Sequence, residues 1–187
     1  MKREVTADNM RLRVEKVGEY FTFNEMITTN VRDLSNMPPD HLLEKVIENL
    51  KSLCSHVLDP LRSQHGVVNI TSGYRSPNIN FRVGGSTNSQ HTKGQAADLY
   101  LNDVDHLTAA IWIADNTQFD QLILEFCVCD GTEYTYQHCP GWIHVSRKLQ
   151  SHHNVKQRGE ILLAGRDNRS KFRYSKSSYE DLRRRLI

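Results

Sequence analysis

The chain has 187 residues, of which 38% are hydrophobic and 25% charged, and its formal net charge is +2. This length is enough for one domain with a full-sized core, and the composition excludes an extensively disordered protein. No run approaches the roughly 18 apolar residues that cross a bilayer. The basic N-terminus is not followed by an apolar stretch, so it predicts no secretory signal, and we expect the protein to be cytoplasmic at synthesis.

Positive charge is concentrated at the C-terminus. Residues 166–187 contain eight Lys or Arg and three Asp or Glu, whereas acidic residues outnumber basic ones in the remainder. Such a tail can bind an anionic polymer, or it can be a solvated terminal segment with a short amphipathic helix. It does not indicate a nucleic-acid-binding protein.

The N-terminal third of the chain predicts helices. Residues 1–19 have no clear period and are expected to form an arm, after which Thr22 and Glu25 have the spacing of a capping box. From Asp40, the expected N-cap, apolar residues recur every three or four positions up to a stop at Gly66, which predicts a long amphipathic helix. Its apolar face comprises Leu43, Val46, Ile47, Leu50, Cys54, Val57, Leu58 and Leu61.

The period then changes to that of short strands. The β-rich runs are residues 67–71, 96–101, 121–126 and 142–146, with a helical pattern at 103–116. These elements predict an α+β fold, in which a small antiparallel sheet of about four strands is flanked by helices. We therefore divide the chain into the arm at 1–19, a domain at 20–150 and a basic extension at 151–187.

The four cysteines do not have the spacing of a zinc knuckle or a redox pair. Cys127 and Cys129 lie two apart in an apparent strand, and either can pair with Cys139 if the protein is oxidised. Without a secretion signal, reduced cysteines that pack in the interior, as expected also for Cys54, are favoured.

Three residues stand out as candidates for chemistry. Asp98 lies among apolar residues of a predicted strand, where an unpaired carboxylate would cost several kcal/mol. His91 ends the polar loop before it, and His144 interrupts another apolar strand. Each residue alone has an ordinary structural explanation, but two imidazoles and one carboxylate together form a ligand set for a catalytic zinc with one open position.

The surrounding residues resemble a known family. Ser89-x-His91, Asp98 after six further residues and the later Trp142-x-His144 resemble the zinc D-alanyl-D-alanine carboxypeptidases and the phage L-alanyl-D-glutamate endolysins, whose superfamily includes the hedgehog signalling domain. The preceding Ser-Gly-Tyr-Arg-Ser at 72–76 and Val-Gly-Gly at 83–85 match one branch of it, and Asn80 fills the position of its asparagine. The resemblance covers roughly residues 20–147.

This resemblance implies a hydrolase that cuts peptide bonds of bacterial peptidoglycan. His91, Asp98 and His144 would hold one zinc ion, which activates water for attack on the scissile carbonyl. Arg75 matches the family arginine that binds a substrate carboxylate or stabilises the oxyanion, although its pattern also fits a surface ion pair. Ser89 would orient the substrate or the His91 ring, or serve only to stabilise its loop.

The general base departs from the family pattern. Relatives of the carboxypeptidase type have an acidic residue three positions before the second zinc histidine, where this chain has Gly141. Glu125, which ends the neighbouring strand, is our candidate for the base, with Glu133 and His138 as weaker alternatives.

Two other functions are consistent with the same residues. One is a zinc-stabilised binding module with little or no turnover, which the glycine at position 141 favours. The other is a virion component that uses the basic tail. The lack of a secretion signal fits a phage protein released at lysis or carried in the particle, and it equally fits a cytosolic dipeptidase.

Overall fold

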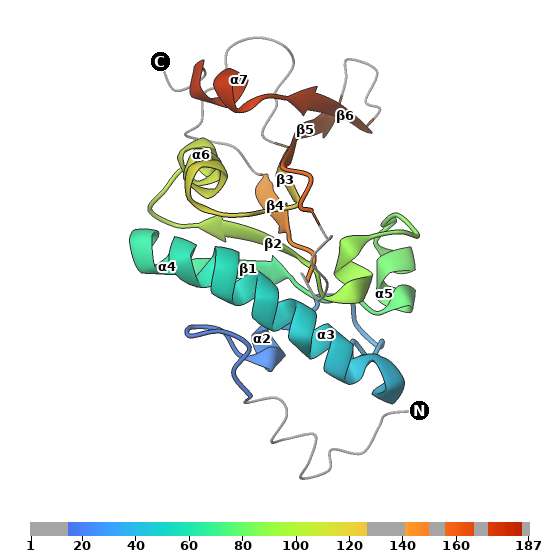
Figure 1. The fold of residues 1–187 in the computed structure, drawn as a ribbon. Coiled ribbons are helices and arrows are strands. Elements are labelled where there is room, and N and C mark those ends of the chain that lie inside the picture. The colour runs from blue at the N-terminus through green and yellow to red at the C-terminus, as the bar shows by residue number, and fades with distance from the viewer. Residues whose placement is uncertain (1–14, 127–140, 150–155, 167–171, 185–187) are drawn as a thin grey trace.

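A computed structural model describes residues 15–126, 141–149, 156–166 and 172–184. Figure 1 labels its elements in chain order. The helices are α2 (Phe23–Met26), α3 (Asp40–Leu53), the π-helical turn η1 (Cys54–Leu58), α4 (Asp59–His65), α5 (Pro77–Arg82), the 3₁₀ turn η2 (Gln90–Lys93), α6 (His106–Asn116) and α7 (Tyr179–Arg184). The strands are β1 (Val68–Ser72), β2 (Ala96–Leu101), β3 (Gln121–Glu125), β4 (Trp142–Ser146), β5 (Glu160–Arg166) and β6 (Phe172–Ser177).

The N-terminal helices follow the local sequence signals. The side chain of Thr22 and that of Glu25 form the predicted capping box of α2. Before it, Val17 is buried and Lys16 pairs with Thr22 as an isolated bridge, so the last residues of the expected arm pack against the domain. Residues 1–14 lie outside the described part.

The long predicted helix forms, with one irregular turn. The α3, η1 and α4 elements are continuous, and they end at Gly66, which has a positive φ of 82°. The π turn lies just before Pro60, and we attribute it to this residue, because a proline removes one helical donor and crowds the preceding turn. Asp40 is the first helical residue and Pro39 holds the cap position, so the predicted N-cap was wrong by one residue.

Within the described residues, the sheet has six strands in the order β1-β2-β4-β3-β5-β6, not the expected four. All neighbours are antiparallel except β3 and β5, which are parallel. The two additional strands come from the segment at 151–187, so the sheet continues past the domain boundary predicted at residue 150. Because this segment is strongly charged, the short apolar run from Ile161 to Ala164 was not predicted as a strand. The run forms the middle of β5 and is mostly buried.

The two faces of the sheet differ in polarity. One face is apolar and belongs to the hydrophobic core, through Ala97, Leu99, Leu122, Leu124, Ile143, Val145, Ile161 and Leu163. Helix α6 contacts β2, β3 and β4, and α4 contacts α6 and β1; Figure 1 shows the long α3–α4 helix running alongside β1. Because side chains alternate along a strand, the residues between these core positions all lie on the opposite face, which we call the site face.

Only one of the four cysteines lies in the described residues. Cys54 is buried on the core side of the long helix and is not in a disulfide. The pairing considered for Cys127, Cys129 and Cys139 falls outside the described residues.

Candidate metal centre

His91, Asp98 and His144 lie together in the structure. The Oδ1 atom of Asp98 is 3.1 Å from Nε2 of His91 and 2.9 Å from Nδ1 of His144, and these two nitrogens are 3.1 Å apart. All three side chains are buried, with exposed fractions of 2%, 5% and 7% in chain order. Residues that are 53 positions apart in the sequence therefore form one compact group of three donors.

Sheet pairing brings two of the three residues together. Asp98 and His144 are direct partners in the antiparallel pairing of β2 with β4, so their side chains lie side by side on the site face. His91 comes from η2, just before β2. The hydroxyl of Ser89 accepts a hydrogen bond from the backbone N–H of His91 and caps this turn, and Gly94 ends it with a left-handed backbone.

The ring of His91 is oriented by a backbone carbonyl. Its Nδ1 lies 2.7 Å from the carbonyl oxygen of Gly73 and donates a hydrogen bond to it, which leaves Nε2 as the acceptor that faces Asp98 and His144. Gly73 itself packs against the backbone of Met26, where a Cβ atom would come within 2.3 Å of the Met26 carbonyl oxygen. The predicted Ser-Gly-Tyr-Arg-Ser motif thus needs its glycine for close packing.

The carboxylate of Asp98 uses its two oxygens differently. Oδ1 faces the two histidines, whereas Oδ2 forms an ion pair with Nη2 of Arg75. Burial alone would raise the pKa of Asp98, but the charges and hydrogen bonds of His91 and His144 outweigh it and hold this pKa well below its ordinary value. The carboxylate is therefore ionised and oriented.

The three residues fit a zinc ion. They offer two imidazole nitrogens and one carboxylate oxygen, all within 4.8 Å of one another. A tetrahedral zinc with ligand bonds of about 2.0–2.1 Å separates its ligand atoms by roughly 3.3 Å, close to the separations described above. The hydrogen bond at Nδ1 of His91 also provides the outer contact that orients metal-bound histidines.

A family comparison agrees with this geometry. The family model described as Peptidase M15 matches residues 19–146, which include all three donors. The chain belongs to the Peptidase M15 family. Members of this family are zinc-dependent peptidases, so the match supports the predicted zinc metallopeptidase and the predicted family resemblance at this level. A search of curated proteins found no significant match.

In this M15 family member, Arg75 lies directly beside the three donors. Its Nη2 is 3.0 Å from Nε2 of His91, in addition to its contact with Asp98, and its Nε donates to the hydroxyl of Ser72 at 2.7 Å. The guanidinium is mostly buried. Arg75 therefore orients the carboxylate of Asp98, and its predicted role toward substrate stays a prediction.

The predicted base, Glu125, lies on the same face as the three donors. Ile123 pairs with His144, and Glu125 follows two positions later on β3, so it occupies the adjacent row of the site face. Burial raises the pKa of Glu125, and the negative charge of Asp98 raises it further, against the opposing effects of His144 and Arg75. Glu133 and His138, the weaker alternatives for the base, lie outside the described residues.

A buried ion cluster, which we did not predict, braces the turn that carries His91. Asp120 is fully buried and is bound by Lys148 and Arg158. Gln90, next to His91, donates to Asp120 and accepts from both Ser146 and Arg158. No local sequence signal connects Asp120 with Arg158.

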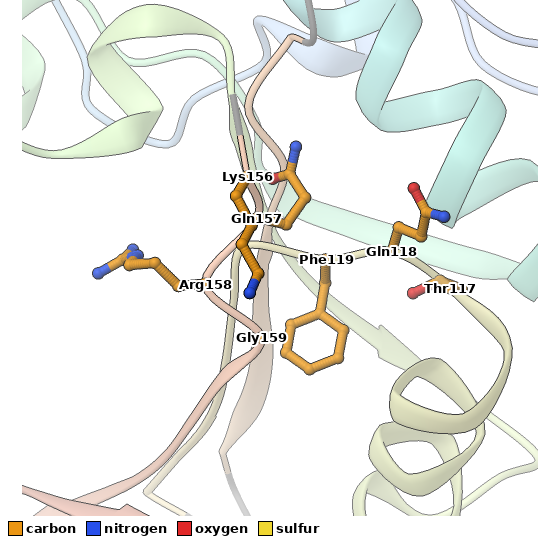
Figure 2. A pocket seen from close by; sticks show the side chains of 7 residues that line it. All are labelled: Thr117, Gln118, Phe119, Lys156, Gln157, Arg158 and Gly159. Carbon is orange, nitrogen blue, oxygen red and sulfur yellow. The ribbon is translucent and has the colours of Figure 1, made fainter. Parts of the chain in front are cut away.

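The cavity in Figure 2 does not belong to this site. It has a volume of about 330 Å³ and is lined by residues 117–119 and 156–159. These segments precede the parallel strands β3 and β5, whereas Glu125 lies at the other end of β3. Figure 2 shows the side chain of Arg158 pointing away from Phe119. None of the predicted site residues lines this cavity.

Within the described part of the chain, no helix combines the length and apolar character needed to span a membrane.

Proposed function

We propose that this protein is a zinc-dependent peptidase that hydrolyses a peptide bond in the stem peptide of bacterial peptidoglycan. The observation that carries the proposal is the buried group of His91, Asp98 and His144, with Glu125 in the adjacent row of the same sheet face. The family match supports the peptidase class and a peptidoglycan substrate. Both a carboxypeptidase acting at D-Ala-D-Ala and an endolysin-type endopeptidase are consistent with this site.

The three donors would hold one zinc ion, which polarises the scissile carbonyl and lowers the pKa of water when bound. Glu125 would accept the proton of the attacking water and return it to the leaving amine. Its raised pKa suits the first of these steps, because a carboxylate with a higher pKa is a stronger base and accepts the proton of the attacking water more readily.

Arg75 would act from beside Asp98. Its contact with Oδ2 orients that carboxylate toward the two histidines, and its fixed positive charge is close enough to attract a substrate carboxylate or an oxyanion. Ser89 would act by holding the backbone of His91 through its cap hydrogen bond. Alternatively, the hydroxyl of Ser89 would orient the substrate directly.

A second candidate function is a zinc-stabilised binding module without efficient turnover. The observation that favours it is Gly141, at the position where carboxypeptidase relatives have an acidic residue. If the module belongs to a virion, the basic residues of its C-terminal part would contact an anionic polymer.

Turnover assays with purified peptidoglycan and with a peptide ending in D-Ala-D-Ala separate these functions. We expect product release that chelator abolishes, that added zinc restores, and that His91→Ala removes. Glu125→Gln should lower kcat by about 10²–10⁴-fold while keeping the metal, because it removes only the proton acceptor. Stoichiometric zinc without release from either substrate would reject the peptidase and support the binding module.

A further inference from the structure

The site face of the sheet extends well beyond the three metal donors. The pairing register aligns Asp98, His144, Ile123, Leu162 and Lys176 in one row across five strands. The adjacent row contains Trp142, Glu125, Ala164 and Tyr174. Paired residues lie on the same face, so β6 adds Tyr174 and Lys176 to the surface that carries the metal centre. Figure 1 shows β6 at the outer edge of this sheet.

Tyr174 is within electrostatic range of the catalytic candidates. Ala164 pairs with both Tyr174 and Glu125 on the strand between them, and it is a buried residue whose side chain is a single methyl group. Two strand spacings amount to about 10 Å, a gap that long side chains can close over so small a neighbour. Burial raises the pKa of Tyr174, and the negative charges of Glu125 and Asp98 raise it further, while Arg75 opposes them.

Lys176 lies farther along the same face, at a distance that suits a peptide. Three strand spacings separate it from His144, about 14 Å, which is the length of about four extended residues. The side chains of Tyr174 and Lys176 are both exposed, and 55% of the tyrosine surface is open to solvent. Glu160, two positions before Leu162 on β5, is bound by Arg158 and Gln121.

We propose that Tyr174 and Lys176 form a subsite for a carboxylate of the peptide substrate, three or four residues from the bond that is cut at the metal centre. The phenol of Tyr174 and the ammonium of Lys176 are hydrogen-bond donors, and stem peptides carry free carboxylates at this spacing. Both residues lie outside the family match, so the subsite is a feature of this chain's C-terminal segment. The inference rests on the proposed function and specifies which part of the substrate is recognised.

The test uses the pentapeptide L-Ala-D-Glu-L-Lys-D-Ala-D-Ala and two amidated forms, one at the D-Glu carboxylate and one at the C-terminus. The full chain carrying both Tyr174→Phe and Lys176→Gln should lose about tenfold in kcat/KM on the free-acid peptide, mainly through KM, because one charge-assisted contact is removed. On the amidated peptide that lacks the contacted carboxylate, the double variant and the wild type should have equal kcat/KM values. An equal loss on all three peptides, or no loss, would overturn the subsite.

Arg173→Gln is the matched control. Arg173 lies on the same strand and is also exposed, but its side chain belongs to the opposite face, so removal of its charge should leave the preference for the free acid unchanged. If Arg173→Gln loses the preference for the free-acid peptide as the double variant does, general charge attraction, and not a subsite, explains that preference. Thermal unfolding of each variant checks that the edge strand is intact.

A binding measurement keeps this inference separate from the catalytic proposal. Zinc-loaded Glu125→Gln protein, with and without the two β6 substitutions, is titrated with the same peptides by calorimetry. We expect tighter binding of the free acid than of one amidated form by about tenfold, and loss of this difference when Tyr174 and Lys176 are substituted. If the wild type cleaves no peptide, yet the zinc-loaded protein binds the free acid more tightly than the amidated form, the catalytic proposal fails and the subsite stands. Equal affinities for the free acid and both amidated forms would reject the subsite.

Discussion

Two buried aspartates of this protein each contact an arginine, but only one of them also contacts histidines. Asp98 contacts His91, His144 and Arg75, whereas Asp120 contacts Lys148, Arg158 and Gln90. Burial by itself would raise both pKa values, and in both cases hydrogen bonds and neighbouring positive charges lower them instead. Burial and a lowered pKa are thus the same at the two sites and do not distinguish their functions.

The partners make the distinction. Lysine and arginine only donate hydrogen bonds and cannot coordinate a metal while charged, so they neutralise Asp120 and make it a structural brace. An imidazole can release its proton and then offers a nitrogen lone pair, so beside Asp98 the two histidines complete a candidate ligand set. Perturbed carboxylates therefore become candidates for catalysis only when their partners can also act as ligands or exchange protons.

The largest effect should follow from substitution of the aspartate in the metal centre. Asp98→Asn replaces an anionic ligand by a neutral amide and should weaken zinc binding by more than 100-fold, since changes in the outer contacts of a zinc site already cost about 10–100-fold. Turnover should be lost with it. Isothermal titration of the metal-free protein with zinc measures this effect. Affinity within threefold of the wild type would show that Asp98 is not a ligand.

The matched substitution at Asp120 should lower the stability of the fold and leave zinc binding unchanged. Asp120→Asn should lower the free energy of unfolding by about 1–3 kcal/mol, because it removes the charge of a fully buried group that Lys148 and Arg158 bind, and it should retain zinc. The lowered folded-state pKa means that the stabilisation is present above the ordinary pKa of 3.8 and is lost as the pH falls below it. Urea unfolding of both proteins at pH 7 and at pH 3 measures the difference.

The difference in stability between wild type and Asp120→Asn should be smaller at pH 3 than at pH 7. Loss of zinc from Asp120→Asn at pH 7, to the same extent as from Asp98→Asn, would instead mean that the brace controls the metal centre through Gln90.

Glu125 differs from both aspartates, because its pKa is raised and not lowered. The pKa of Glu125 is raised above its ordinary value of 4.5, so a base at this position loses its charge at a higher pH than an exposed glutamate does. We expect kcat/KM to fall about tenfold per pH unit below a midpoint above 4.5, since only the ionised form accepts the proton. The pH profile of Glu125→Gln should lack this limb in its residual activity. A limb that persists in this variant would assign it to another group.

Much of the candidate metal centre was predictable from local sequence. Asp98 and His144 each interrupt an apolar strand, and His91 ends the polar loop before the first of these strands, so together they mark ligand candidates. The strands at 96–101 and 142–146 have the predicted bounds, because alternation and β-branched residues specify them locally. The capping box of Thr22 and Glu25 was equally local.

The rest depended on partners that are distant in the chain. The parallel pairing of β3 with β5 extends the sheet, but no local property of residues 160–166 identifies β3 as their neighbour. The brace at Asp120 likewise needs Arg158, 38 positions away. The same pairing decides that Tyr174 shares a face with Glu125.

By itself, the sequence indicated three candidate metal ligands, the long α3–α4 helix, α6 and the strands β1 to β4, since residue chemistry and hydrophobic period are local properties. The tertiary structure alone decided how Asp98 divides its two oxygens, which carboxylate became a brace, and that the C-terminal strands extend the site face. These features depend on the register between strands, and a shift of one residue would turn each of these side chains to the other face of the sheet.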